Sequence, residues 1–195
     1  MSPDENRSKA VNLTVHGFFA LIALCILLAS CEPGLKFDAL RPDIEASGHH
    51  IAGVPFFKQP AAACGPAALA SVLSFRGRQV DLETIKSNVY LPALRGTLPL
   101  DMERYPREQG FTVDSGAGSY DKLTAVLRGN APVICLLDLG FSMYKQPHYV
   151  TVIGFDELRE VVIMHDGETP NRLMRRDRFM RAWSRAGNWM MVVKP

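Results

Sequence analysis

The sequence of 195 residues lacks the motifs by which proteins commonly bind metals and nucleotides. It has no Cys-x-x-Cys and no His-Glu-x-x-His, so nothing gives zinc its usual ligand spacing, and we expect no metal and no other cofactor. It also has no Gly-x-x-x-x-Gly-Lys-Ser/Thr loop to hold a nucleoside triphosphate, which excludes an ATP-driven transporter within this chain. Any chemistry must therefore come from ordinary side chains.

An excess of charge is lacking as well, since 22 Lys and Arg residues stand against 20 Asp and Glu residues and the formal net charge is +2. This balance predicts no nucleic-acid partner, because such partners usually require a basic field. One local cluster of arginines lies between Arg172 and Arg185, interrupted by Asp177. It is typical of the solvated face of a helix, and contact with anionic lipid headgroups is the alternative.

The apolar run of residues 17–30 is too short to cross a membrane, because it has fourteen uncharged residues and a spanning helix needs about 20. Arg7 and Lys9 precede it and the polar sequence CEPG follows it, which is the plan of a signal peptide. We therefore expect residues 1–30 to be a signal peptide that is removed. A permanent transmembrane anchor is the alternative.

Cysteine is scarce, and the second of the four cysteines ends the sequence Leu28-Ala29-Ser30-Cys31. These residues resemble the bacterial lipobox, which implies that Cys31 becomes a lipidated N-terminus whose acyl chains anchor the protein in the cell envelope. By the same resemblance, Glu32 implies sorting to the periplasmic face of the outer membrane in a Gram-negative cell. An ordinary secreted protein is the alternative.

Cys25 would leave with the signal peptide and Cys31 would be lipidated, so two free thiols remain, which is too few for a disulfide framework. Cys135 lies within the apolar run PVICLLDL and is expected to be a buried small hydrophobic residue. A bridge between Cys64 and Cys135 is conceivable in an oxidising compartment. It would occupy the one thiol that has a chemically interesting setting.

The remaining length fits one domain with its own core, which we place at residues 51–195. Residues 31–50 contain proline and glycine without a sustained period and are expected to be a membrane tether. The first half of the domain predicts helices at 66–76, 81–90, 101–110 and 120–128, with a strand at 111–115. Asp81 and Ser119 are expected N-caps, and Pro106 is expected to interrupt the third helix.

The second half of the domain is rich in β-forming residues. Four strands are predicted at 132–139, 148–156, 160–166 and 189–194, with an amphipathic segment at 176–185 whose Phe179 and Trp183 should face the core. Helices followed by strands predict an α+β fold, in which a helical part packs on a mainly antiparallel sheet.

Cys64 stands directly before Gly65, Pro66 and the first helix of the domain. A helix N-terminus presents free N–H groups and a positive dipole end, which favour the reactive thiolate. Gly65 would let a substrate backbone approach closely. Cys64 is therefore the candidate nucleophile, and a buried structural cysteine is the alternative.

A nucleophile needs a base, and the base needs a partner that orients it. His148 opens a strand beside a loop, whereas His49 and His50 lie in the expected tether, where nothing would hold them. Asp166 ends the next strand, so antiparallel pairing would bring it to His148, where it could accept a hydrogen bond from the imidazole. Gln59, five residues before Cys64, could donate its amide to an oxyanion together with the Cys64 N–H.

These residues carry a resemblance. The segment VPFFKQPAAACGPAALASVLSFRG, followed by PHYVTVIGF and HDG, resembles the papain-like double-glycine peptidases that process bacteriocin leaders, and their stand-alone relatives. The resemblance implies a papain-like fold and a cysteine peptidase in which Cys64 is the nucleophile, His148 the base, Asp166 its orienting partner and Gln59 the oxyanion donor. The partners implied are a peptide or protein substrate and a separate export system.

Three positions depart from the transporter-linked members of that family. Ala63 stands where an acidic residue is usual, Gly167 stands where a proline is usual, and Gln59 precedes Cys64 by five residues where six are usual. Two hypotheses therefore stand. One is a lipid-anchored cysteine peptidase, and the other is a catalytically silent module that keeps the groove to bind a peptide or a partner lipoprotein.

Overall fold

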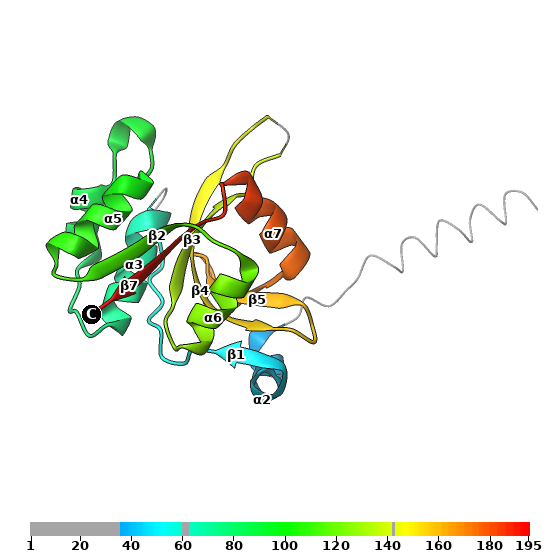
Figure 1. Ribbon diagram of the computed structural model, residues 1–195. Coiled ribbons are helices and arrows are strands. Elements are labelled where there is room, and N and C mark those ends of the chain that lie inside the picture. The colour runs from blue at the N-terminus through cyan, green and yellow to red at the C-terminus, as the bar shows by residue number, and fades with distance from the viewer. Residues whose placement is uncertain (1–35, 60–62, 142) are drawn as a thin grey trace, which may run out of the picture. The chain divides into compact units, whose positions relative to one another are not determined.

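The computed structural model describes residues 36–59, 63–141 and 143–195 (Figure 1). The signal peptide at 1–30 and the lipidation site at Cys31 lie outside the described residues, so both stay predictions. Within the part that is described, none of the helices combines the length and the apolar character needed to span a bilayer.

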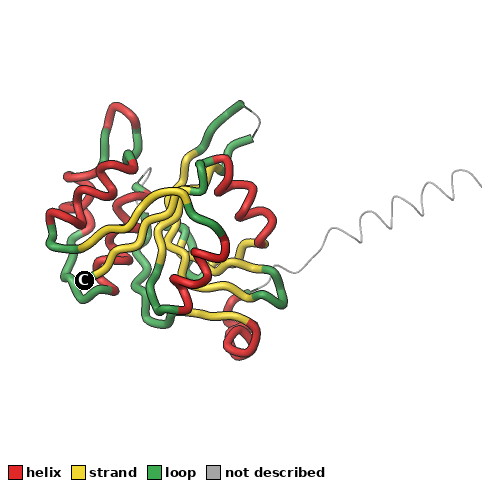
Figure 2. The backbone as a smooth tube through the Cα atoms, in the orientation of Figure 1, coloured by secondary structure: helices red, strands yellow, loops and turns green. Residues whose placement is uncertain are grey.

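A seven-stranded sheet forms the centre of the domain, and its strand pairs among the described residues are antiparallel. The spatial order is β2-β7-β3-β4-β5-β6, and β1 pairs with β4. The strands are β1 (Gly48–His50), β2 (Thr112–Ala117), β3 (Val133–Asp138), β4 (Pro147–Asp156), β5 (Val161–His165), β6 (Arg172–Arg175) and β7 (Trp189–Lys194). Figure 2 shows the strands as one continuous layer with helices on either side.

The helices cover both faces of this sheet. They are α2 (Phe37–Ser47), α3 (Cys64–Phe75), α4 (Leu82–Val89), the short 3-10 helix η1 (Pro92–Leu94), α5 (Pro99–Glu108), α6 (Tyr120–Arg128) and α7 (Arg176–Arg185). Side chains of α3, α4 and α5 share one core cluster, and those of α2, α6 and α7 share the other. Along β3, Val133 and Cys135 belong to the second cluster and Ile134 to the first, which is the alternation of a strand buried on both faces.

The α+β prediction is confirmed, and so are the predicted helix caps and buried aromatic residues. The Asp81 carboxylate accepts from the Thr84 N–H and the Ser119 hydroxyl accepts from the Lys122 N–H, which caps α4 and α6 respectively. Phe179 and Trp183 are fully buried. Gly77, after the end of α3, takes a positive φ of 82°.

The expected tether at residues 31–50 is wrong for the part that is described, because Phe37–His50 folds as α2 and β1. Phe37 and Ile44 are buried in the core and Leu40 packs against it. Their spacing of three and four residues is the helical signal that a composition of prolines and glycines obscured.

Two smaller differences concern β6 and α5. The strand β6, which pairs with β5, is made of RLMR and has too few β-branched residues to stand out in the sequence. Pro106 lies inside α5 without interrupting it, and the helix continues to Glu108. Near a C-terminus, a proline leaves only a short last turn to be disturbed.

Candidate active site

Cys64 is the first residue of α3, and its N-cap Ala63 offers no side-chain hydrogen bond. The first N–H groups of the helix are therefore free to face an anion. The adjacent Gly65 is required by the packing of the protein itself, because a Cβ there would lie 2.9 Å from the Thr97 side chain and 3.1 Å from the Met102 sulfur. The expected close approach of a substrate backbone at Gly65 is thus replaced by close approach of Thr97.

His148 lies at the start of β4, half-buried, with its Nε2 2.9 Å from the backbone carbonyl oxygen of Asp166. A carbonyl oxygen only accepts, so Nε2 must carry a proton and donate it. Nδ1 is then the ring nitrogen left for the Cys64 thiol, which lines the same cavity as His148 and raises the pKa of the imidazole. The Asp166 carbonyl thereby sets the orientation of the ring.

The pKa values of Cys64 and His148 are shifted in opposite directions. Burial raises the pKa of Cys64, but the His148 hydrogen bond and charge together with the backbone amides of Tyr149 and Gly65 outweigh it, so the pKa is lowered overall. Burial lowers the pKa of His148, but its contacts with Cys64 and Asp166 raise it overall. A thiolate beside an imidazolium is the state that these shifts favour.

Asp166 is almost fully buried and reaches His148 through its main chain, while its carboxylate is engaged elsewhere. Oδ1 accepts from the N–H of Glu168 at 3.0 Å and of Thr169 at 2.6 Å, and Oδ2 accepts from Arg172 at 2.5 Å. Burial raises the pKa of Asp166, and these three donors lower it overall. The carboxylate is therefore a charged cap of the turn that follows β5.

Gln59 lies against the same turn. Its N–H donates to the Gly167 carbonyl at 2.8 Å, and its side-chain amide donates to the Glu168 carboxylate at 3.1 Å. Gly167 has a φ of 83°, and a Cβ there would lie 2.8 Å from the Gln59 side chain. The glycine that departs from the family pattern is thus needed for two reasons, since proline cannot take a positive φ and any side chain would collide with Gln59.

A cavity of about 440 Å³ opens beside these groups. Gln59, Cys64 and His148 line it together with Tyr149 and the loop 94–98. Leu94 and Leu98 of that loop are exposed. This loop and Tyr149 were not singled out from the sequence, because their only signal is spatial: α5 and β4 bring them to the cavity.

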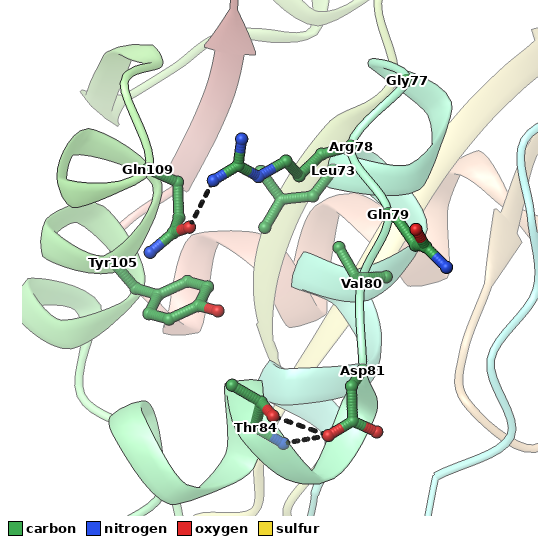
Figure 3. Close-up of a pocket in the computed structure, with 9 residues that line it drawn as sticks. All are labelled: Leu73, Gly77, Arg78, Gln79, Val80, Asp81, Thr84, Tyr105 and Gln109. Carbon is green, nitrogen blue, oxygen red and sulfur yellow. Dashed lines mark hydrogen bonds between the residues drawn. The ribbon is translucent and has the colours of Figure 1, made fainter.

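A larger cavity, of about 580 Å³, lies on the helical side of the domain (Figure 3). None of the four candidate catalytic residues lines it. Arg78 donates to the Gln109 side chain there, and the Asp81 carboxylate is used in capping α4. The groups drawn in Figure 3 thus serve local structure.

His165, at the end of β5, is held as a structural residue. Its Nε2 lies 3.0 Å from the Val54 carbonyl oxygen, and its Nδ1 accepts from the Asn171 N–H at 3.1 Å. Burial lowers its pKa. With both ring nitrogens occupied it cannot serve as a base. His49 and His50, which lie in β1 and not in a tether, do not line the cavity beside Cys64, whereas His148 does.

Cys135 is fully buried in the middle of β3, and both Cys64 and Cys135 are free thiols. Burial raises the pKa of Cys135 strongly, so it stays protonated. Among the described residues, no group of three or more His, Cys, Asp or Glu side chains is arranged to hold a metal ion.

Several solved structures share this fold. A C39-like peptidase from Bacillus anthracis matches with a TM-score of 0.63 and 16% identity, covering 76% of this chain and 98% of its own. A double glycine motif protease from an AMS/PCAT transporter, in complex with the leader peptide, matches with a TM-score of 0.60 and 22% identity, covering 75% and 94%. Xylellain, a cysteine protease from Xylella fastidiosa, matches with a TM-score of 0.52 and 10% identity, covering 79% and 88%.

Among curated proteins, no sequence matches this chain significantly. The family model described as "Peptidase_C39 like family" matches residues 51–191, which is most of the chain and includes the sheet except β1 and the last three residues of β7. The chain has the helical part before an antiparallel sheet, and a cysteine at the start of α3 beside a histidine on β4. It belongs to the Peptidase_C39 like family.

Proposed function

We propose that the protein is a cysteine peptidase that hydrolyses peptide bonds at Cys64. The observation that carries this proposal is that Cys64, at the start of α3, and His148, on β4, line one open cavity. The pKa is lowered at Cys64 and raised at His148, which supports the same pairing. Structural cysteines buried in apolar surroundings shift the other way, as Cys135 does.

In the first step the Cys64 thiolate attacks the carbonyl carbon of the scissile bond, and the π electrons move to the carbonyl oxygen. In this proposal the Cys64 N–H and the Gln59 amide donate hydrogen bonds to that oxyanion. When the intermediate collapses, the carbon–nitrogen bond breaks and the His148 imidazolium gives its proton to the leaving amine. A thioester between Cys64 and the acyl half of the substrate remains.

In the second step water attacks the thioester while neutral His148 accepts its proton. The carbon–sulfur bond then breaks and the acid product leaves, which restores the thiolate and the imidazolium. Throughout both steps Asp166 keeps the imidazole oriented, and Nε2 stays protonated because its partner is a carbonyl oxygen.

The substrate class is a peptide or a peptide segment of a protein. A structural neighbour was solved with its leader peptide, which supports a similar substrate here, supplied by a separate export system. Removal of a signal peptide at residues 1–30 would leave Cys31 as a lipidated N-terminus, which would anchor the domain in a bacterial envelope, on the periplasmic face of the outer membrane in a Gram-negative cell.

One observation favours the second candidate function, a catalytically silent peptide-binding module. The side-chain amide of Gln59 donates one of its two N–H groups to the Glu168 carboxylate, which keeps that N–H away from an oxyanion. In a silent module the amide would stay there when a peptide binds.

Trapping in the native cell separates the two functions. A Cys64→Ser variant is expected to retain peptides that the wild type releases as fragments, and mass spectrometry would identify both. Intact peptides bound to the wild type after long incubation would overturn the peptidase proposal and favour the binding module.

A further inference from the structure

We infer that Arg172 is a positioning residue for the active site, acting through the turn of residues 166–169, hereafter the positioning turn. This inference deepens the proposed peptidase function and rests on it. No feature of the sequence pointed to Arg172, which lies in an arginine-rich segment that reads as a solvated surface.

The positioning turn touches both groups that assist Cys64. Its first carbonyl, that of Asp166, accepts from the His148 ring at 2.9 Å. Its second carbonyl, that of Gly167, accepts from the Gln59 N–H at 2.8 Å, and the Glu168 carboxylate accepts from the Gln59 amide at 3.1 Å. A displacement of this one turn would therefore move the base and the oxyanion donor together.

The Asp166 carboxylate is what holds the positioning turn in shape. Its Oδ1 accepts from two successive N–H groups, those of Glu168 and Thr169. The turn passes through Gly167 at a φ of 83°, a conformation that glycine adopts freely and that does not by itself fix the turn. The carboxylate thus closes the loop of chain that presents the Asp166 carbonyl to His148.

Arg172 is in turn what holds the carboxylate. Its guanidinium donates to Asp166 Oδ2 at 2.5 Å, and no other cation forms a salt bridge with Asp166 among the described residues. The Asp166 side chain is 6% exposed, so its charge depends on a local partner. Arg172 is the first residue of β6 and pairs with Met164 of β5, so the sheet fixes the backbone from which the Arg172 side chain extends.

Loss of Arg172 would leave a buried carboxylate with two N–H donors and no countercharge. The carboxylate would then turn toward solvent or take up a proton, and either change would release the turn. The His148 ring would lose its fixed acceptor at Nε2, and the thiolate–imidazolium pair would weaken.

The test compares Arg172→Ala and Arg172→Lys with Arg175→Ala as the matched control. Arg175 lies on the same strand, is 64% exposed and pairs with Asp177, away from the turn. The measurement is the pH dependence of Cys64 alkylation by iodoacetamide on the full chain, followed by mass spectrometry of the Cys64 peptide. Circular dichroism confirms that each variant is folded.

We expect Arg172→Ala to shift the alkylation profile of Cys64 to higher pH and to lower its rate in mildly acidic buffer about tenfold, since small misplacements in an active site have effects of this order or larger. Arg172→Lys should retain part of the rate, because the charge remains without the planar fork. Arg175→Ala should match the wild type. A profile of Arg172→Ala that coincides with the wild type would overturn the inference.

A second readout separates this inference from the proposed function. In the wild type the Nε2 proton of His148 should exchange slowly with water and be visible by nitrogen-15 NMR of the ring, and in Arg172→Ala it should be lost. If wild-type Cys64 reacts like an ordinary thiol, the proposed function fails, yet the Nε2 proton still decides the role of Arg172. An unchanged Nε2 signal in the variant would contradict the inference in either case.

Discussion

The two cysteines in the described part of the chain show how strongly position determines chemistry. Cys64 begins a helix, contacts His148 and borders an open cavity, whereas Cys135 lies at the centre of the sheet with no exposed surface. Burial acts on both thiols in the same direction, but only Cys64 has partners that reverse its effect on the pKa. A reactive thiol therefore requires donors and a neighbouring cation, and exposure alone does not provide them.

The largest effect should follow from removing the nucleophile. Cys64→Ala is expected to abolish peptide cleavage, while Cys135→Ala should leave it at the wild-type level. Cleavage assays with peptides recovered from the trapping experiment would measure both. Cleavage by Cys64→Ala above the buffer rate would show that another group performs the chemistry.

Removing the base should have the next largest effect. In His148→Ala, Cys64 loses the hydrogen bond and the charge that lower its pKa, so turnover should fall by about 10² to 10⁴, the range of general acid–base catalysis. Alkylation of Cys64 should then require higher pH, as for an unassisted thiol. His165→Gln is a useful comparison, because it should affect stability more than the alkylation profile.

The pH profile of kcat/KM should report the same pair. Activity is expected to rise as pH passes the lowered pKa of Cys64, where the thiolate forms, and to fall as pH passes the raised pKa of His148, where its proton is lost. The plateau should therefore be broad. A single rising limb at the pKa of a free thiol would contradict the ion pair.

Asp166→Asn should have a smaller effect, a fall in turnover of about tenfold, well under the loss of up to about 10⁴ known for a carboxylate that itself holds the catalytic histidine. The acceptor of His148 is the main-chain carbonyl, which asparagine keeps, and an amide oxygen can still accept from the turn. Steady-state kinetics would measure this fall in turnover. A fall near 10⁴ would show that the carboxylate holds the imidazole directly during turnover.

The smallest effect on activity should come from the buried thiol. Cys135→Ala should cost about 1 kcal/mol of unfolding free energy, since it removes one fully buried sulfur and leaves a small cavity. Urea denaturation would measure this difference. Unchanged stability together with reduced cleavage would mean that Cys135 has a role in the site.

Much of the fold could be predicted from the sequence, because local signals agree with the tertiary structure. The caps at Asp81 and Ser119 and the apolar run of 132–139 are examples that need no knowledge of distant residues. The helix α2 was missed because its few apolar residues make sense only against the core that they complete.

The candidate site shows a sharper limit. Residue types and strand order were sufficient to propose Cys64, His148, Asp166 and Gln59. The sequence could not predict whether His148 contacts the side-chain carboxylate or the backbone carbonyl of Asp166. Both groups belong to the same residue, and only the folded structure shows which of them faces the imidazole. Arg172 was beyond prediction for a similar reason, since its partner is set by the pairing of β6 with β5.

The central claim, that Cys64 is a thiolate held by His148, is tested most directly by labelling the native protein with an electrophilic thiol probe in mildly acidic buffer. Mass spectrometry of the two peptides would give separate rates for Cys64 and Cys135. We predict rapid labelling of Cys64 and labelling of Cys135 only after unfolding. Equal rates at the two cysteines in the folded protein would contradict the account.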